Sequence, residues 1–461
     1  MMRRLLHSAA PLIALATAAC MTAPAPPPTV APASATGPFA ALPVASIAPV
    51  PDDWWRLYQD AQLDALVEAS LAANVDLRIA YANLDASRAA LRGAKAARLP
   101  TTTIESALTV DDPSNQPSAA SISASDWDVA ATVSWDIDLF GRLRSGALAA
   151  QADAAAQAAA TDAVKVAVVA DTVQAYVDLC GAAQAMGEAQ AVASAQERSL
   201  ALVREQLAAG EVSPLEVSQA AALAASTRAE IAPFAAQRAN ALYRIATLQG
   251  RPPAEARGFA LTCATAPRFQ TAAPVGDGTA LLLRRPDIRE AERKLAAAAA
   301  RIGVARADLY PRVNLGGALG LLAGGFDAAA SPLVSWAFPN QGPARAKLTQ
   351  ARATEQAALA GWDAAVLKAL REVETALADY DAEVRRNRDL TASVAEAGDY
   401  ARRAAARVRL GDASGLLQVD AERTLASARL AKARSDLAVS TAEVALFRAL
   451  GGGWRSGGGP G

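Results

Sequence analysis

The sequence predicts a mixed α and β membrane protein, in which three copies share a 12-stranded outer-membrane β-barrel that continues into a long periplasmic α-helical barrel. Three observations support this fold class. Residues 127–139 alternate between apolar residues and polar or small ones, which is typical of a barrel strand in a membrane. Residues 142–210 contain no proline and carry apolar residues at helical spacing. Both kinds of segment recur in the second half of the chain, which indicates an internal two-fold sequence repeat.

The N-terminus predicts export. Residues 1–19 have the order of a signal peptide, with Arg3 and Arg4 before a short apolar stretch and small residues before Cys20. This order resembles a bacterial lipoprotein signal, in which the cysteine becomes the acylated first residue. The alternative is ordinary signal-peptidase cleavage after Ala18. We expect lipidation at Cys20.

Composition and repetition divide the rest of the chain into segments. Residues 20–51 are rich in Pro, Ala, Thr and Ser, and predict either an extended lipidated tether or an arm that follows the protein surface. Two repeats follow at 52–250 and 286–450, and the linker 251–285 separates them. The Gly-rich tail 451–461 predicts disorder.

Glycines 201 positions apart align the two repeats, Gly141 with Gly342 and Gly210 with Gly411. Each repeat should contain a helix, a β-hairpin (about 101–140 and about 312–339), a long helix and a return helix. The first long helix would reach roughly 100 Å at 1.5 Å per residue. The shorter helices are expected at 63–99, 214–250, 286–310 and 414–450.

The chain passes almost directly from residue 139 into a helix, as expected where a membrane barrel continues into a helical barrel beneath it. Thirteen tilted residues span roughly 30 Å, the thickness of a bilayer core. Trp127 and Trp135 could lie near the two membrane interfaces. Four strands cannot close a barrel, and open edges in lipid have no hydrogen-bond partners, so three chains should contribute strands together. The expected strands are 103–110, 127–139, 313–322 and 333–338, with loops at 111–121 and 322–332.

Several functional classes find no support in the sequence. The 45 basic and 46 acidic residues give no reason to expect a nucleic-acid partner. The single histidine, His7, lies in the signal, and neither a Cys/His metal cluster nor a phosphate-binding loop occurs, so we expect no enzyme, cofactor or metal. Glu372 and Glu374 lie on a charged helix, where solvation or i,i+4 pairing is expected.

The two other cysteines stand in different contexts, Cys180 in a helical pattern and Cys263 in the linker. We expect two small buried residues rather than a disulfide, although export permits one. No apolar run of about 18 residues is present, so no membrane-spanning helix is expected.

Several stretches together resemble the outer membrane factors, the TolC-like exit ducts of tripartite efflux systems, in their lipoprotein branch. They include "SWDIDLFGRLRSG" at 134–146, "LLLRRPDIREAERKLAAAAARIGVARADLYPRVNLGGALG" at 281–320 and "GGGW" at 451–454. The resemblance implies a passive homotrimeric channel for small molecules such as drugs or toxic compounds. It also implies a periplasmic adaptor (membrane fusion protein) and an inner-membrane pump of the resistance-nodulation-division type as partners. The protein would lie in the outer membrane, lipid-anchored, and extend into the periplasm.

The resemblance also implies a gate near the second helical turn. A gate aspartate lies nine residues after the turn glycine, which matches Asp420 after Gly411. Leu417 and Ala413 stand where some members have an acidic residue and an arginine, so the ion-pair latch of those members is in doubt. We expect the aperture to depend on Asp420 and on packing around Leu416 and Leu417; alone, Asp420 would read as a solvated helix residue. The tips expected to contact the adaptor comprise Gly210, Ser213, Pro214, Gly411 and Ser414.

A second hypothesis is a periplasmic lipoprotein adaptor or coiled-coil scaffold. Such a protein would also use long helices at heptad spacing, and often a lipid anchor. It would not need two bilayer-length β-hairpins, one in each repeat. The duct therefore explains more of the sequence.

Overall fold

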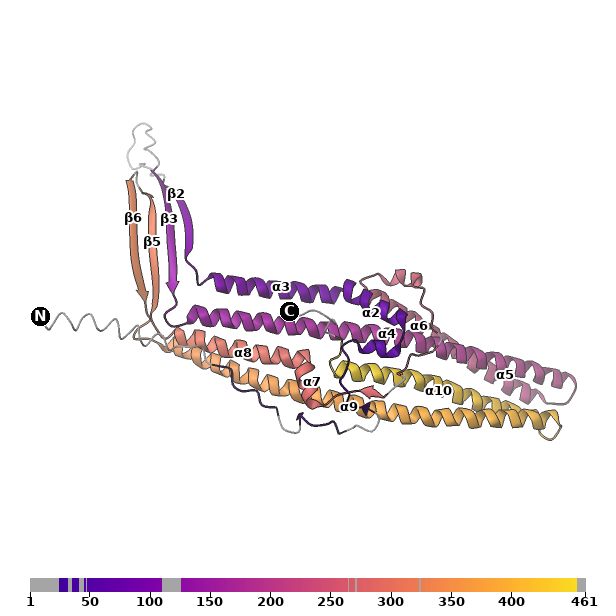
Figure 1. The fold of residues 1–461 in the computed structure, drawn as a ribbon. Helices are drawn as coiled ribbons and strands as arrows, with labels where there is room; N and C mark the ends of the chain where they lie inside the picture. The colour runs from indigo at the N-terminus through magenta and orange to yellow at the C-terminus, as the bar shows by residue number, and fades with distance from the viewer. Residues whose placement is uncertain are drawn as a thin grey trace, which may run out of the picture. The chain divides into compact units, whose positions relative to one another are not determined.

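The computed structural model describes residues 25–31, 35–40, 45–46, 48–109, 126–263, 265–269, 272–322 and 325–453, so Cys20 and the signal lie outside the described residues. The chain forms two compact units (Figure 1). One, here called the sheet unit, includes residues 82–159 and 288–365. The other, here called the tip unit, includes residues 31–81, 160–287 and 366–461.

The sheet unit contains one antiparallel sheet with the strand order β2-β3-β5-β6. The central pair joins the two halves of the chain, because β3 pairs with β5 from Val129 opposite Leu321 to Ile137 opposite Val313. The outer edges of β2 and β6 have no partner strand among the described residues. The strands are β2 (Thr101–Thr109), β3 (Asp126–Ile137), β5 (Arg312–Leu322) and β6 (Gly325–Ser335).

The strand register places most of the apolar side chains on one face, although Thr102 and Ser106 share that face and Leu333 lies on the other. Residues directly opposite each other in an antiparallel ladder share a face. One face carries Ile104, Val129, Val133, Trp135, Val313, Leu315, Leu319 and Val334. The opposite face carries Thr101, Thr103, Glu105, Thr132, Ser134, Asp136, Asn314 and Ser331. None of the described side chains of the sheet is buried, so the described residues cover neither face.

The fourth strand corrects the predicted boundaries. The expected strand at 333–338 is wrong: β6 begins at Gly325 and ends at Ser335, so most of the expected loop 322–332 is strand. Alanines fill its middle and hide the alternation that larger residues would reveal. Pro332 also argued against a strand, but β6 is an edge strand, where a missing N–H group is tolerated.

Side-chain hydrogen bonds fix the passage from strand to helix. The carboxylate of Asp138 accepts the backbone N–H groups of Leu143 (2.9 Å) and Arg144 (2.7 Å), which caps the first turn of α4 (Arg142–Ala208). The indoles of Trp135 and Trp336, 201 positions apart, donate to the carbonyls of Arg98 and Leu309 at 3.1 and 3.2 Å. The side chain of Trp127 lies outside the described residues.

The helices follow the predicted order, with two breaks. The expected helix at 63–99 ends and restarts at Asn74, whose side chain accepts the N–H of Leu77 at 3.0 Å. The expected helix at 214–250 breaks at Glu230, close to Pro233, which lacks the N–H that a continuous helix needs. The helices are α2 (Ala61–Ala73), α3 (Val75–Ala96), α5 (Pro214–Ala229), α6 (Ile231–Leu248), α7 (Gly278–Arg284), α8 (Pro286–Ala307), α9 (Gly342–Arg409) and α10 (Gly415–Ala449), with 3-10 turns η2 (Trp54–Tyr58) and η3 (Pro253–Gly258).

The α4 helix contains an apolar 18-residue window, contrary to the expectation that none existed. By length and composition alone this helix could cross a membrane. However, 72% of that window is buried inside the protein, as in the central helix of a packed core. Val169, Val173 and Tyr176 of α4 are each fully buried there.

Residues from the N-terminal and C-terminal parts of the tip unit pack together in its core. Trp54 stacks on Phe447 with ring centroids 4.9 Å apart. Part of the segment before η2 pairs with the linker, since β1 (Ala45–Ser46) and β4 (Ala273–Pro274) form a two-stranded parallel sheet. Residues 451–453 of the tail, predicted to be disordered, are buried. A Cβ at Gly452 would lie 2.7 Å from the ring of Trp54, so that position requires glycine.

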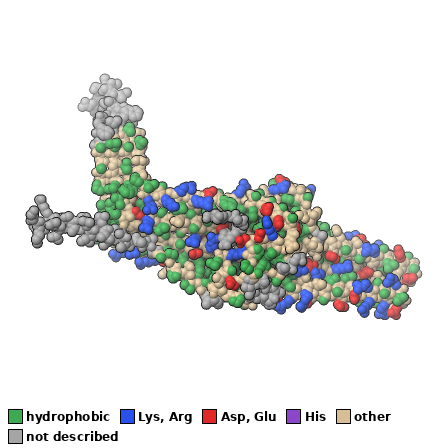
Figure 2. Space-filling view, in the orientation of Figure 1, with side chains coloured by type: hydrophobic (Ala, Val, Ile, Leu, Met, Phe, Trp, Pro, Cys, Tyr) green, Lys and Arg blue, Asp and Glu red, His purple; other side chains and the backbone are tan. Residues whose placement is uncertain are grey.

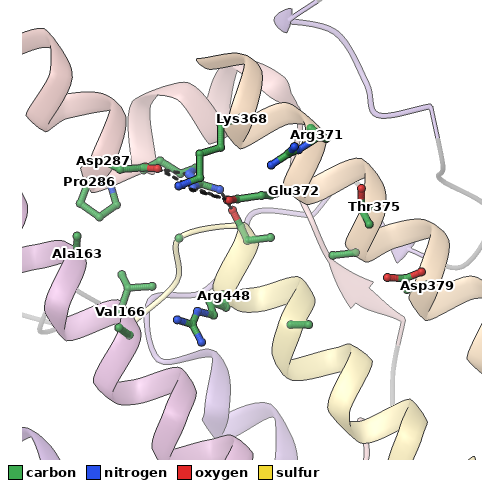
Figure 3. Close-up of a pocket in the computed structure, with 16 residues that line it drawn as sticks. Ala163, Val166, Pro286, Asp287, Lys368, Arg371, Glu372, Thr375, Asp379 and Arg448 are labelled. Carbon is green, nitrogen blue, oxygen red and sulfur yellow. Dashed lines mark hydrogen bonds and ion pairs between the residues drawn. The ribbon is translucent and has the colours of Figure 1, made fainter. Parts of the chain in front are cut away.

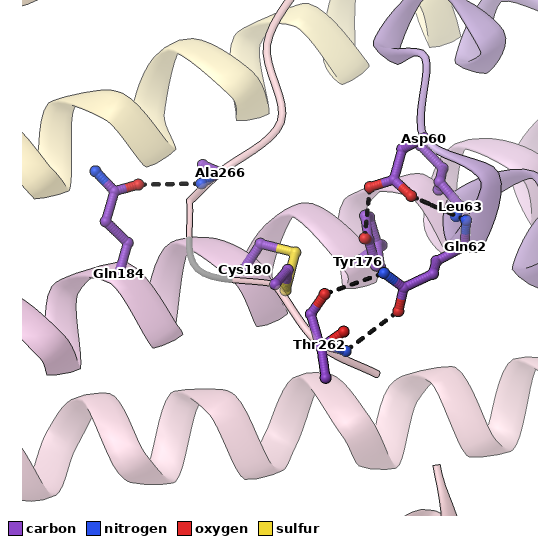
Figure 4. The surroundings of a disulfide bond; sticks show 9 residues. Asp60, Gln62, Leu63, Tyr176, Cys180, Gln184, Thr262 and Ala266 are labelled. Carbon is purple, nitrogen blue, oxygen red and sulfur yellow. Dashed lines mark hydrogen bonds between the residues drawn. A yellow bond between two sulfur atoms is a disulfide. The ribbon is translucent and has the colours of Figure 1, made fainter. Parts of the chain in front are cut away.

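Cys180 and Cys263 form a disulfide, which corrects the prediction of two free buried cysteines (Figure 4). The linker passes directly over α4 and brings the two Cα atoms to 5.2 Å. Hydrogen bonds hold it there: the amide of Gln62 donates to the Thr262 carbonyl (3.0 Å) and accepts its N–H (3.2 Å), and Gln184 accepts the N–H of Ala266. No motif in the linker predicts that it docks on this helix.

Candidate functional site: the helical tips and their supports

Both long helices end in the same backbone motif. In α4 the N–H of Glu211 donates to the carbonyl of Gln206 (2.9 Å), and the N–H of Gly210 donates to Leu207 (3.0 Å). This is the Schellman pattern, which needs a left-handed residue at its fifth position. Gly210 supplies it with φ +78°.

The end of α9 repeats this motif 201 positions later. Asp412 donates to the carbonyl of Arg407 (2.9 Å), Gly411 donates to Val408 (3.0 Å), and Gly411 has φ +74°. We call residues 201–216 the first tip and residues 402–417 the second tip. Both are in the tip unit, and they lie side by side, since Gln206 of the first tip is the nearest side chain to Gly415 of the second (Figure 1).

The two return helices are capped differently. Ser213 forms a full capping box: its Oγ accepts the N–H of Leu215, and Glu216 accepts the N–H of Ser213 at 2.8 Å, with Pro214 opening α5. Ser414 holds the same position before α10, but its side chain accepts no hydrogen bond. Leu417 stands where the first tip has Glu216, so the second tip lacks the reciprocal partner.

The gate candidates lie on the first turns of α10. Leu416 is half exposed and Leu417 is partly buried. Asp420 is bonded by the guanidinium of Arg423 (Nη2 to Oδ1, 2.6 Å), and the hydroxyl of Tyr400 donates to it at 3.4 Å. The charge of Asp420 is therefore partly offset within one chain, which the sequence reading did not anticipate.

A buried arginine, Arg285, supports the tip unit, and its partners Asp287 and Glu372 are labelled in Figure 3. Its guanidinium bonds both oxygens of Asp287 (2.9 and 2.7 Å), Glu372 of α9 (2.7 Å) and the carbonyl of Ala449 (2.7 Å). Glu372 also pairs with Lys368 at i,i+4 (3.8 Å), as expected, but its partner across helices is Arg285. We call Arg285 with these three partners the clamp, and a cavity of about 750 Å³ opens beside it.

The preceding residue, Arg284, holds the N-terminal arm. Its guanidinium donates to the carbonyls of Val50 and Pro51 and to the carboxylate of Asp52 (2.7 Å). The two adjacent arginines therefore join the arm, α9 and the end of α10. In the sequence this pair was part of a family signature without an assigned role.

A buried carboxyl group, Glu443, lies on the core face of α10. Its side chain is 2% exposed and is surrounded by the phenols of Tyr58 and Tyr380 and by Arg268. Burial raises the pKa of Glu443 to about 7, although Arg268 and the Phe269 backbone oppose the rise. The spacing Val439, Glu443, Phe447 placed it on an apolar stripe, which was the available sequence signal.

Within the described ranges, no group of three or more His, Cys, Asp or Glu side chains could hold a metal ion. The arrangement is that of a structural conduit: a sheet with one apolar and one polar face, and long helices that end in paired tips. Figure 2 shows uncharged side chains over most of the strands and dense charge over the helices. These features define a channel protein of the outer membrane.

Comparisons with known proteins agree with this class. The model of a family described as "Outer membrane efflux protein" matches residues 66–251 and 279–452, and the chain therefore belongs to that family. Outer membrane protein OprJ of Pseudomonas aeruginosa is 32% identical, over 97% of this chain and 95% of OprJ. The toluene efflux pump outer membrane protein TtgC of Pseudomonas putida is 30% identical, over 89% and 87%. The solved outer-membrane channel OprN superposes with a TM-score of 0.85 at 33% identity, over 94% of this chain and all of that one.

Proposed function

We propose that three copies of this chain form one continuous duct, a shared 12-stranded barrel on a helical barrel, through which small apolar molecules leave the cell. The observation that carries the proposal is the sheet of the sheet unit. It has two open edges, one apolar face and one polar face, and none of its described side chains is buried. A membrane strand needs lipid on its apolar face and a partner at each edge. Threefold symmetry supplies both edges and leaves the polar face toward a lumen.

The partners and cargo follow from the same proposal. The two tips would meet a periplasmic adaptor, and an inner-membrane pump of the resistance-nodulation-division type would supply energy. TtgC is described as part of a toluene efflux pump, which supports apolar compounds as cargo. We also propose duplication of one ancestral repeat, since the helix–strand–strand–helix order and the tip motif both recur.

The function is tested in the host cell. Deleting the gene should raise the accumulation of toluene and of an apolar fluorescent dye, and the wild-type gene should restore efflux. Collapse of the proton gradient should remove the difference between the two strains. Equal accumulation in the deletion and wild-type strains under full energisation would favour a scaffold over a duct.

The shared barrel predicts crosslinks between chains. Thr103→Cys in β2, combined in turn with cysteine at Ala329, Ser331 or Leu333 in β6, should yield dimers and trimers under mild oxidation and nothing larger. At least one of the three pairs should react because all four positions belong to the polar face. Each single-cysteine variant is the control. Monomers alone from all three pairs would contradict the shared barrel.

We also propose that Cys20 is the lipidated first residue of the mature protein. The intact mass of the protein extracted from membranes should equal a chain that starts at Cys20 plus its lipid. A chain that starts at Ala19 without lipid would instead support ordinary cleavage. Because the barrel itself would hold the protein in the membrane, Cys20→Ala behind a cleavable signal should still give trimers.

The gate is proposed at Asp420, three copies of which would form a ring of negative charge. In planar bilayers, Asp420→Ala should reduce cation selectivity several-fold and weaken block by a trivalent cation. Arg423→Ala should have the opposite result, with higher cation selectivity and stronger block, because it removes the cation bonded to Asp420. Asp363→Ala, at an exposed position of α9 far along the chain from the tip, serves as the control. Unchanged selectivity and block in Asp420→Ala would move the gate elsewhere, for example to Asp412.

A further inference from the structure

The two tips occupy equivalent positions in the repeats but carry opposite charge. The first tip contains one arginine and three glutamates, for a net charge of −2. The second tip contains four arginines and one aspartate, for a net charge of +3. The backbone motifs are the same, so the difference lies only in side chains. The two ends therefore offer the same shape with different electrostatics.

Two charged side chains at each tip are exposed and have no ion-pair partner among the described residues. In the second tip Arg407 bonds Asp412 (2.9 Å) and Arg402 pairs with Asp399, whereas Arg403 and Arg409 are exposed and have no ion-pair partner among the described residues. In the first tip Glu205 and Glu211 are exposed, again without a cation partner within the part of the chain that the structure describes.

Apolar side chains lie beside these charges. Leu410 is 83% exposed and Leu416 50% exposed at the second tip, and Leu215 is 65% exposed at the first. Large side chains this exposed at the ends of rigid helices are available to a partner. An exposed ion pair joins Glu230, at the junction of α5 and α6, to Arg434 of α10 at 2.8 Å, so the two return helices are in contact.

We infer that the second tip docks a helical hairpin with acidic side chains next to apolar ones, and that the first tip receives a basic counterpart. This inference rests on the proposed function, in which that partner is the adaptor. In a threefold assembly, tips of charge −2 and +3 would alternate around the ring. A surface with acidic side chains would therefore be attracted by the second tip and repelled by the first, and a basic surface the reverse, which fixes the rotational register of the adaptor.

The test uses the full-length protein in its host, with Leu410 replaced by a photo-crosslinking amino acid to report adaptor contact. Arg403→Glu combined with Arg409→Glu should reduce crosslinking to the adaptor by about tenfold and abolish dye efflux, while trimer yield stays unchanged. Glu205→Lys combined with Glu211→Lys should act in the same way at the first tip. The matched control is Arg385→Glu combined with Arg388→Glu, two exposed arginines farther back on α9.

Suppressor selection gives the decisive readout. Efflux lost through Arg403→Glu and Arg409→Glu should return through adaptor changes that replace an acidic residue at the hairpin end by a neutral or basic one. Unchanged crosslinking and efflux in the charge-reversed protein would overturn the inference. If Gly411→Val abolished efflux while charge reversal did not, the tips would dock without charge recognition and the proposed function would survive. If deletion of the whole gene left efflux unchanged, the proposed function itself would fail.

Discussion

Replacing Arg285 by alanine should destabilise the tip unit by about 3 kcal/mol, because it removes the donor shared by two carboxylates and a helix-end carbonyl. The guanidinium is 8% exposed, whereas Asp287 and Glu372 are about one-third exposed and can regain some water. That partial exposure places the effect at the lower end for a broken buried pair. Urea unfolding of the purified protein in detergent, followed by circular dichroism, measures the change.

Two further variants separate the clamp from simple loss of charge. Arg285→Lys keeps the charge but loses the bidentate fork on Asp287, so its stability should fall between those of the wild type and the alanine variant. Lys294→Ala removes an exposed i,i+4 partner of Glu290 and should cost less than about 1 kcal/mol. Equal stability of Arg285→Ala and Lys294→Ala would show that the clamp contributes nothing.

Glu443→Gln should make stability nearly independent of pH between about 5 and 8. The folded-state pKa of Glu443 is about 7, against an ordinary value of 4.5, so the folded protein binds the proton more tightly than the unfolded chain does. Stability from this group is therefore full below pH 4.5 and is lost as pH rises to 7. The loss amounts to about 3 kcal/mol above pH 7. Unfolding of the wild type and the variant at pH 5 and pH 8 measures it.

The neutral glutamine should thus stabilise the protein at pH 8 and change little at pH 5. Glu396→Gln, at an exposed position of α9, should leave the pH dependence of the wild type intact. The same loss of stability with pH in Glu443→Gln as in the wild type would assign the effect to another group.

The sequence was sufficient for the repeated order of elements because that order depends on local rules. Strict alternation marked β3, and the glycines at 210 and 411 marked the helix ends through a backbone conformation that other residues rarely adopt. The boundaries of β6 could not be predicted in the same way, because its alanines and Pro332 carry no local strand signal. Only the pairing with β5 makes that segment a strand.

The supports of the candidate site were harder to predict, because they depend on residues far apart in the chain. Arg285 meets Glu372 and Ala449, and no spacing rule connects these three positions. The partner of Asp420 was nearer, since Arg423 lies at i,i+3, and attention to helical neighbours would have found it. The disulfide could not be predicted, because it depends on the linker returning to α4, and no local pattern in the sequence shows that return.

That disulfide also bears on how the protein is made. Both cysteines are in the first 263 residues, and the bond closes a segment of 83 positions without any residue that follows. A chain that enters the periplasm N-terminus first can therefore be locked by an oxidase while its second repeat is still crossing the inner membrane. An intermediate of biogenesis would then be a half-chain that the disulfide has already closed and whose sheet still lacks strand β5.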